Sequence, residues 1–95
     1  MKELKEKYNN YILEQSFVPN QVILRFENDY GMSIIPNRYS YGGLEGLYEI
    51  AYIYFVNEDV KNFELVYVKE FEDQVKGYLR LGDVYKYIDK AIKGE

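Results

Sequence analysis

The sequence predicts an α+β fold in one domain spanning residues 1–95, with the element order α-β-β-β-β-α and a four-stranded antiparallel sheet. Apolar residues recur with helical spacing near each end of the chain, whereas they alternate with polar residues in the middle. Turn-forming residues separate the alternating runs. A chain of 95 residues is large enough for one hydrophobic core and too small for two. We therefore expect the two helices to cover one face of the sheet.

The N-terminal stretch, residues 2–15, has the pattern of an amphipathic helix. Its apolar residues fall on one stripe: Leu4, Tyr8, Tyr11 and Ile12. Asn9 and Asn10 are poor helix formers, so packing against the sheet has to hold this helix in place of intrinsic propensity.

The stretch from Gln21 to Pro36 predicts a β-hairpin. Apolar and polar residues alternate over 21–27, and a second strand follows over 32–35. The turn residues between the strands end in Gly31, at a position expected to need a positive φ. Pro36 cannot donate a hydrogen bond to a neighbouring strand, so it fits a strand end.

Residues 47–56 are the most strand-like run of the chain, and 63–68 follow as the fourth strand. Both faces of 47–56 are largely apolar, which predicts a central strand or a face covered by a partner. Two short helices can cover only one face of the sheet. We therefore expect the other face, or an edge, to need a partner, and we predict a homodimer.

Residues 69–80 are expected to connect the sheet to a last helix over 81–93. Arg80 offers no oxygen to cap that helix, whereas Gly94 fits its C-terminal end. The apolar stripes predict four buried residues in particular: Leu24, Phe26, Ile50 and Val84.

The charges and the missing residue types exclude several classes of protein. The formal charge of −4 is spread along the chain, whereas a nucleic-acid-binding protein presents a basic face. The absence of cysteine and histidine removes disulfides, thiolate nucleophiles, zinc clusters and the commonest general base. The N-terminus lacks the pattern of a signal peptide, and the longest apolar run, 50–56, cannot span a bilayer. We expect a cytoplasmic protein whose partners include neither nucleic acid nor a membrane.

Neighbouring acidic residues do not form a recognisable catalytic or metal site. Glu45 and Glu49 flank a glycine with no sign of the facing carboxylates that glycoside hydrolysis needs. Glu58 and Asp59 lack the alternating oxygen ligands of a calcium loop. We therefore expect no enzyme activity, no cofactor and no metal.

A glycine-rich stretch over 37–49 is the centre of the functional prediction. Three glycines within residues 42–46 disfavour both helix and strand. The stretch precedes a strand, unlike the dinucleotide and phosphate-binding loops that open a helix. The predicted binding residues are Arg38, Tyr39, Tyr41, Gly42, Gly43, Glu45 and Tyr48. The alternative is a wide turn whose tyrosines simply cap the core, and the residues leave both possibilities open.

Tyrosines also line one face of the predicted third strand: Tyr48, Tyr52 and Tyr54. They fit a binding patch or a dimer contact, or else cross-strand packing beneath a helix. We expect packing for Tyr48 and Tyr52, and the sequence leaves Tyr54 open.

Two segments carry a resemblance to a known group of proteins. Residues 39–49, with their YSYGGLEGLYE sequence, and residues 75–79, VKGYL, are followed by a short last helix. In this respect the chain resembles a group of small uncharacterised phage-encoded proteins, from about Val22 to Ile92. That group has a threonine-type cap before the last helix, where this chain has Arg80. The resemblance implies a phage or prophage gene expressed in a bacterial cytoplasm, and it carries over no catalytic residue.

Together these observations predict a non-catalytic phage accessory protein that binds and inhibits a host protein, in a counter-defence role. Residues 38–49 would supply the contact surface, because aromatic and arginine side chains are the usual anchors of protein interfaces. The alternative is a protein that sequesters a small anionic, nucleotide-like molecule, with Arg38 paired to phosphate and Tyr39 or Tyr41 stacked on a base.

Overall fold

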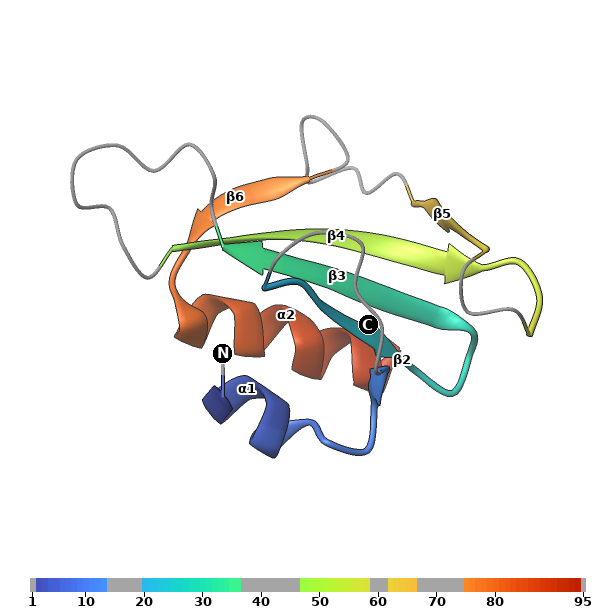
Figure 1. The fold of residues 1–95 in the computed structure, drawn as a ribbon, viewed down its shortest axis with the longest axis horizontal. Coiled ribbons are helices and arrows are strands. Elements are labelled where there is room, and N and C mark those ends of the chain that lie inside the picture. Colours follow the sequence, from blue (N-terminus) through green and yellow to red (C-terminus); the bar gives the residue numbers. More distant parts are fainter. Residues whose placement is uncertain (1, 14–19, 37–46, 59–61, 67–74, 95) are drawn as a thin grey trace.

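The computed structural model describes residues 2–13, 20–36, 47–58, 62–66 and 75–94. Two helices and six strands follow one another in this part of the chain: α1 (Lys2–Lys7), β1 (Ile12–Leu13), β2 (Val22–Arg25), β3 (Tyr30–Pro36), β4 (Tyr48–Phe55), β5 (Phe63–Leu65), β6 (Lys76–Leu79) and α2 (Leu81–Lys93). All the strands pair antiparallel in a single sheet, and both helices lie on one of its faces (Figure 1). The predicted α+β class and the helix-covered face are confirmed, whereas the sheet has more strands than the four predicted.

The N-terminal helix is shorter than predicted. It ends at Lys7, and the Tyr11 carbonyl oxygen accepts a hydrogen bond from the Arg25 backbone N–H at 2.9 Å. Ile12 and Leu13 then pair with β2 as the edge strand β1. The helix prediction is therefore wrong after Lys7. Asn9 and Asn10 disfavour continuation of the helix, and the backbone that follows forms its hydrogen bonds with the edge of the sheet instead.

The hairpin of β2 and β3 is confirmed, but its turn differs from the prediction. Asp29 has the positive φ, at 67°, and Gly31 lies within β3 without one. A Cβ atom at Gly31 would clash with the Leu24 carbonyl oxygen and lie 2.8 Å from the Phe55 ring. Gly31 is therefore needed for close packing across the sheet and not for the turn.

The segment before α2 forms a strand that the sequence reading missed. Residues 76–79 form β6, which pairs with β4 on the same side as β5 but at the other end. The register shifts between Tyr48 and Ile50, and Tyr78 has a φ of 59°, as expected at a β-bulge. Because β3 runs along the opposite edge of β4, the predicted central position of this strand is confirmed.

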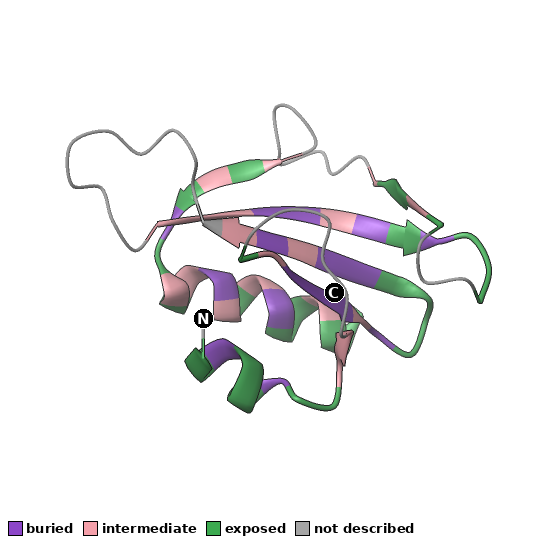
Figure 2. Ribbon diagram, in the orientation of Figure 1, coloured by how far each residue is buried: buried purple, intermediate pink, exposed green. Residues whose placement is uncertain are grey.

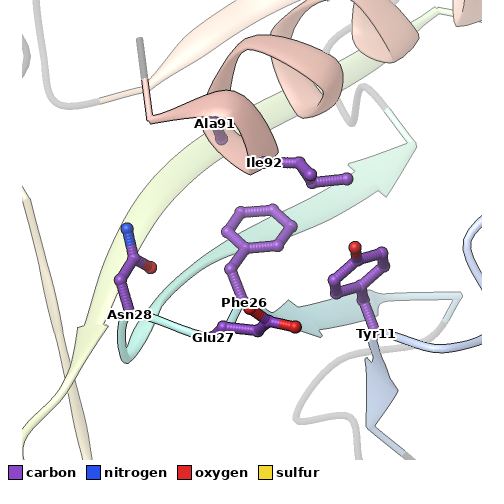
Figure 3. Close-up of a pocket in the computed structure, with 6 residues that line it drawn as sticks. All are labelled: Tyr11, Phe26, Glu27, Asn28, Ala91 and Ile92. Carbon is purple, nitrogen blue, oxygen red and sulfur yellow. The ribbon is translucent and has the colours of Figure 1, made fainter.

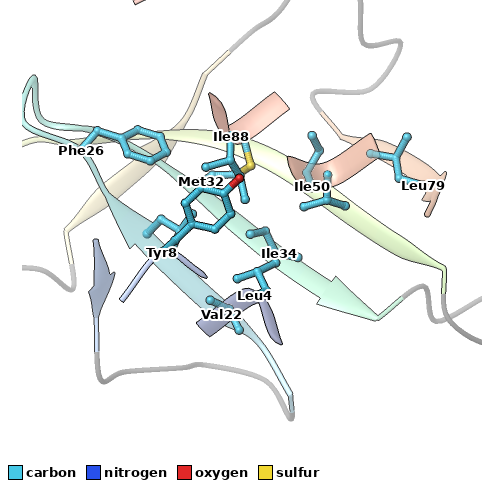
Figure 4. Packing of buried hydrophobic residues seen from close by; sticks show 11 residues of the cluster. Leu4, Tyr8, Val22, Phe26, Met32, Ile34, Ile50, Leu79 and Ile88 are labelled. Atoms are coloured by element: carbon cyan, nitrogen blue, oxygen red, sulfur yellow. The ribbon is translucent and has the colours of Figure 1, made fainter. Parts of the chain in front are cut away.

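The main core lies between the sheet and the two helices (Figure 4). Figure 2 shows buried residues along β3 and β4 and on α2. The predicted burial is confirmed at each of the four named positions: Leu24, Phe26, Ile50 and Val84. Leu4 and Tyr8 from the N-terminal segment join the same cluster, so the stripe predicted there survives despite the shorter helix.

The other face of the sheet is buried at its centre within the single chain. Ile23, Ile53 and Phe55 form a second cluster, each at most 1 % exposed. The Arg25 guanidinium carbon lies 4.7 Å from the centre of the Phe55 ring. The expectation of an uncovered face is therefore wrong at this cluster. The alternative, an edge that needs a partner, and homodimerisation itself remain predictions.

Helix α2 has the predicted bounds and a defined end. The Arg80 side chain makes no cap, and the Asp83 carboxylate instead accepts a hydrogen bond from the Arg80 backbone N–H at 3.3 Å. Gly94 takes the left-handed conformation with φ 79°, and its N–H bonds the Ala91 carbonyl oxygen at 3.1 Å. Within the described residues, no helix has the length and apolar character needed to cross a membrane.

The close packing at Gly31 predicts the effect of a single methyl group. Gly31→Ala should lower the free energy of unfolding by about 1–3 kcal/mol, because the new Cβ meets backbone and the Phe55 ring. The melting temperature should fall by several degrees, roughly 4–8 °C per kcal/mol in a domain of this size. Gly82→Ala is the matched control, since no atom lies within 4 Å of a Cβ in that exposed first turn of α2. Equal melting temperatures for the two variants would contradict this packing.

Candidate functional site

Most of the predicted binding residues lie outside the described part of the chain: Arg38, Tyr39, Tyr41, Gly42, Gly43 and Glu45. Tyr48 is described, as the first residue of β4. It pairs with Leu79 of β6, is half-buried and packs against the main core. Tyr48 therefore contributes to the scaffold beside the predicted loop.

The tyrosines on the helix-facing side of β4 divide as expected. Tyr48 and Tyr52 are half-buried against the core, and the Tyr52 hydroxyl reaches the Tyr87 carbonyl oxygen of α2 at 3.5 Å. Tyr54, which the sequence left open, is 38 % exposed. It is therefore the member of this face that is available to a partner.

Tyr54 belongs to a line of aromatic residues that crosses the sheet, which we call the aromatic row: Tyr11, Phe26, Tyr30 and Tyr54. The Tyr11 and Phe26 rings meet edge to face, with centres 5.7 Å apart. Phe26 donates its backbone N–H to the Tyr30 carbonyl oxygen at 2.7 Å, which places the two residues opposite each other. Tyr30 pairs with Tyr54, and their ring centres are 5.0 Å apart.

Exposure differs sharply between members of the aromatic row. Phe26 is 5 % exposed, whereas Tyr30 is 43 % and Tyr54 is 38 % exposed. Ala91 and Ile92 of the last helical turn lie near Phe26, and α2 ends directly afterwards (Figure 3). Two tyrosine rings in tilted contact are thus accessible beside a buried phenylalanine.

A cavity of about 220 Å³ lies under the end of α2 (Figure 3). Its lining residues are Tyr11, Phe26, Glu27, Asn28, Ala91 and Ile92. A wider and more open groove of about 450 Å³ shares Tyr11, Phe26 and Glu27 with the cavity and extends to Arg25 and Asp29. The cavity is smaller than the ~300–1,000 Å³ typical of small-molecule sites, so its size suits a single side chain.

The charges around these hollows are mainly acidic. Arg25 and Asp29 neutralise each other through an ion pair of 2.7 Å, and Asn28 accepts the Tyr30 backbone N–H at 3.1 Å. The remaining charged side chain of the lining is Glu27. The carbonyl end of α2 adds a partial negative charge. Lys90 and Lys93 belong to the same helical turn but not to the lining.

A second polar cluster joins the N-terminal segment to α2. The Tyr8 hydroxyl donates to the Asp89 carboxylate at 2.9 Å, and the Tyr8 and Tyr85 rings meet edge to face. The Tyr85 hydroxyl is enclosed, and burial raises its pKa, with the Glu3 carboxylate adding to the effect. Because both phenols stay protonated at neutral pH, they serve as structural contacts and supply neither a base nor a nucleophile.

The described residues offer binding contacts and no recognisable catalytic group. Among them, no three acidic side chains lie close enough together to hold a metal ion. The aromatic row and the cavity supply stacking surfaces, apolar contacts and one carboxylate. This combination can bind a partner.

Sequence reasoning assigned the members of the aromatic row to separate elements. Tyr11 was placed in a helix, Phe26 in the core and Tyr30 in a turn. The hairpin contained a usable signal, because a turn centred on residues 27–29 puts Phe26 opposite Tyr30. Tyr11 had no such signal, since its place depends on pairing with β2.

The Tyr8 contact predicts a distinct dependence of stability on pH. Burial raises the pKa of the Tyr8 hydroxyl, and the Asp89 carboxylate raises it further. Above pH ~10 the unfolded chain loses this proton while the folded chain keeps it, so the free energy of unfolding should fall as the pH rises. Tyr8→Phe should remove up to about 1.4 kcal/mol per pH unit of that slope, and should cost about 1 kcal/mol at pH 7.

Urea unfolding at several pH values between neutrality and 12 measures both effects. Asp89→Asn should flatten the slope only in part, because the burial of Tyr8 remains. Wild type and Tyr8→Phe with the same slope above pH 10 would show that Tyr8 does not keep its proton in the folded state.

Comparison with known proteins does not assign this chain to a family. No protein-family model matches the chain, and neither a curated protein nor a solved structure gives a match. The resemblance to small phage-encoded proteins therefore remains an expectation. The functional interpretation has to be built from the described residues themselves.

Proposed function

We propose that this chain is a non-catalytic protein that acts by binding another protein through the aromatic row. The observation that carries the proposal is the pair of tyrosine rings, Tyr30 and Tyr54, which are in tilted contact and exposed. Phe26, the neighbour of Tyr30 in the aromatic row, lines the cavity. Tyrosine provides a large apolar surface with a polar tip and loses little side-chain entropy on binding, so it is enriched at the centres of protein interfaces.

The size of a stable interface extends the contact beyond the aromatic row. A specific complex buries about 800 Å² per partner, about an eighth of the 6509 Å² that this chain exposes. Val56, two residues after Tyr54, is 54 % exposed. Ile92, which lines the cavity, is 37 % exposed. They supply apolar surface around the two tyrosines.

The proposed partner is a host protein that the chain inhibits in the bacterial cytoplasm. This part of the proposal rests on the resemblance to phage-encoded proteins, and it keeps residues 38–49 as a further contact surface. Sequestration of a small anionic molecule is less well supported. Glu27 and the carbonyl end of α2 would repel an anion in the cavity.

Substitution of the exposed tyrosines tests the proposal. Tyr54→Ser and Tyr30→Ser should each lower the amount of partner retained from host lysate by about tenfold or more, because central aromatic anchors contribute on the order of 2 kcal/mol. Both side chains are substantially exposed, so the melting temperature should stay close to that of the wild type. Quantitative mass spectrometry of the retained proteins measures the change.

Leu65→Ser is the matched control for this experiment. Leu65 is 48 % exposed, but it pairs with Ile53 and so faces the side of the sheet away from the helices. Its substitution should leave retention of the partner unchanged. If the partner is retained equally by both tyrosine variants, the aromatic row is not the contact surface and the proposal fails. Loss of the partner in Arg38→Ala alone would move the contact to residues 38–49.

A further inference from the structure

The cavity under α2 combines an aromatic floor, an apolar roof and one carboxylate. The Tyr11 and Phe26 rings stand edge to face at 5.7 Å, and the aliphatic side chain of Ile92 lies across from them (Figure 3). Figure 3 also shows that the carboxylate of Glu27 extends toward the Tyr11 side of the cavity. These three kinds of surface line one cavity of about 220 Å³.

Among the described residues, no ion pair offsets the negative charge of the cavity lining. Glu27 is exposed and forms no ion pair with any residue that the structure describes. Arg25, the cation that lines the adjoining groove, is paired with Asp29 at 2.7 Å and lies over the Phe55 ring on the other face of the sheet. Lys90 and Lys93 of the last helical turn do not line the cavity. The carbonyl end of α2 adds to the negative potential. An uncharged apolar occupant would strip water from the Glu27 carboxylate without replacing its contacts, which is unfavourable.

We propose that this cavity receives an arginine side chain of the partner protein, an inference that rests on the proposed protein-binding function. The planar guanidinium can stack on an aromatic face and bond the Glu27 carboxylate with two parallel N–H groups. The aliphatic part of the side chain then packs against Ala91 and Ile92. Lysine has neither the plane nor the fork, so it fits these surfaces less well.

Charge complementarity distinguishes this occupant from the others. A phosphate-bearing ligand would meet Glu27 and the helix carbonyls with the wrong sign of charge. A leucine-type side chain would satisfy Phe26 and Ile92 but not the carboxylate. A second copy of this chain is the remaining occupant, and its binding would depend on the protein concentration.

An NMR titration with single-residue probes tests the proposal directly. N-acetyl-arginine N-methylamide is added to the ¹⁵N-labelled full chain, with the citrulline and leucine derivatives as matched probes. Citrulline keeps the shape of arginine but lacks the charge. The arginine probe should shift the backbone amides of Glu27, Asn28, Ala91 and Ile92 along one saturation curve in the millimolar range. The citrulline and leucine probes should bind at least about fivefold more weakly than the arginine probe.

Two variants locate the contact. Glu27→Gln should weaken binding of the arginine probe by about fivefold or more, because it removes the charge-assisted pair. Glu6→Gln is the control, since Glu6 is an exposed carboxylate on α1 and does not line the cavity. Equal binding of the citrulline or leucine probe, or no effect of Glu27→Gln, would overturn the arginine assignment. Amide shifts at the cavity that appear on concentrating the protein without a probe would instead assign the cavity to a second copy.

The same variants separate this inference from the proposed function. If Tyr54→Ser releases the host partner while Glu27→Gln retains it and the arginine probe causes no shifts, the arginine inference fails and the binding function stands. If Glu27→Gln releases the partner and the arginine probe shifts the cavity amides, both are supported. If neither Tyr30→Ser nor Tyr54→Ser releases the partner, the binding function through the aromatic row fails, and with it the arginine proposal.

Discussion

The rest of the structure depends on the pairing of β4 along both of its edges. β3 lies against one edge over the full length of β4, while β5 and β6 share the other. This arrangement provides hydrogen-bond partners for the backbone N–H and C=O groups of a strand whose Ile50 and Ile53 side chains are fully buried on opposite faces. Ile50 belongs to the core beneath the helices, and Ile53 to the cluster on the other face. β4 therefore links two hydrophobic clusters in one small domain.

The end of α2 lies close to the proposed binding surface. Val84 and Ile88 are the buried residues of α2, and Gly94 ends the helix in the left-handed conformation. Tyr30 and Tyr54 on the same face are 43 % and 38 % exposed. Phe26, next to Tyr30 in the aromatic row, shares a cavity with Ala91 and Ile92 of the last turn of α2. Changes at Gly94 would therefore alter both the end of this helix and the cavity beside the proposed binding surface.

Tyrosine fits the different positions of this face because one end of its side chain is apolar and the other polar. The Tyr8 ring is buried and its hydroxyl donates a hydrogen bond to Asp89, whereas Tyr54 is 38 % exposed. In the proposed interface, the acidic Glu27 beside such rings would favour a cationic partner by attraction and disfavour anionic ones. The interface we propose thus draws affinity from the aromatic rings and specificity from the carboxylate.

The sequence alone determined the features that local patterns encode: the α+β class, the β2–β3 hairpin, the bounds of α2 and the central place of β4. The candidate site was predictable only in part, since Tyr54 was left open and the predicted residues 38–45 lie outside the described residues. Tertiary structure decided the strands β1 and β6, because each depends on hydrogen bonds to a strand distant in sequence. It also decided the role of Gly31 and the aromatic row, since cross-strand neighbours follow from register, which periodicity does not specify.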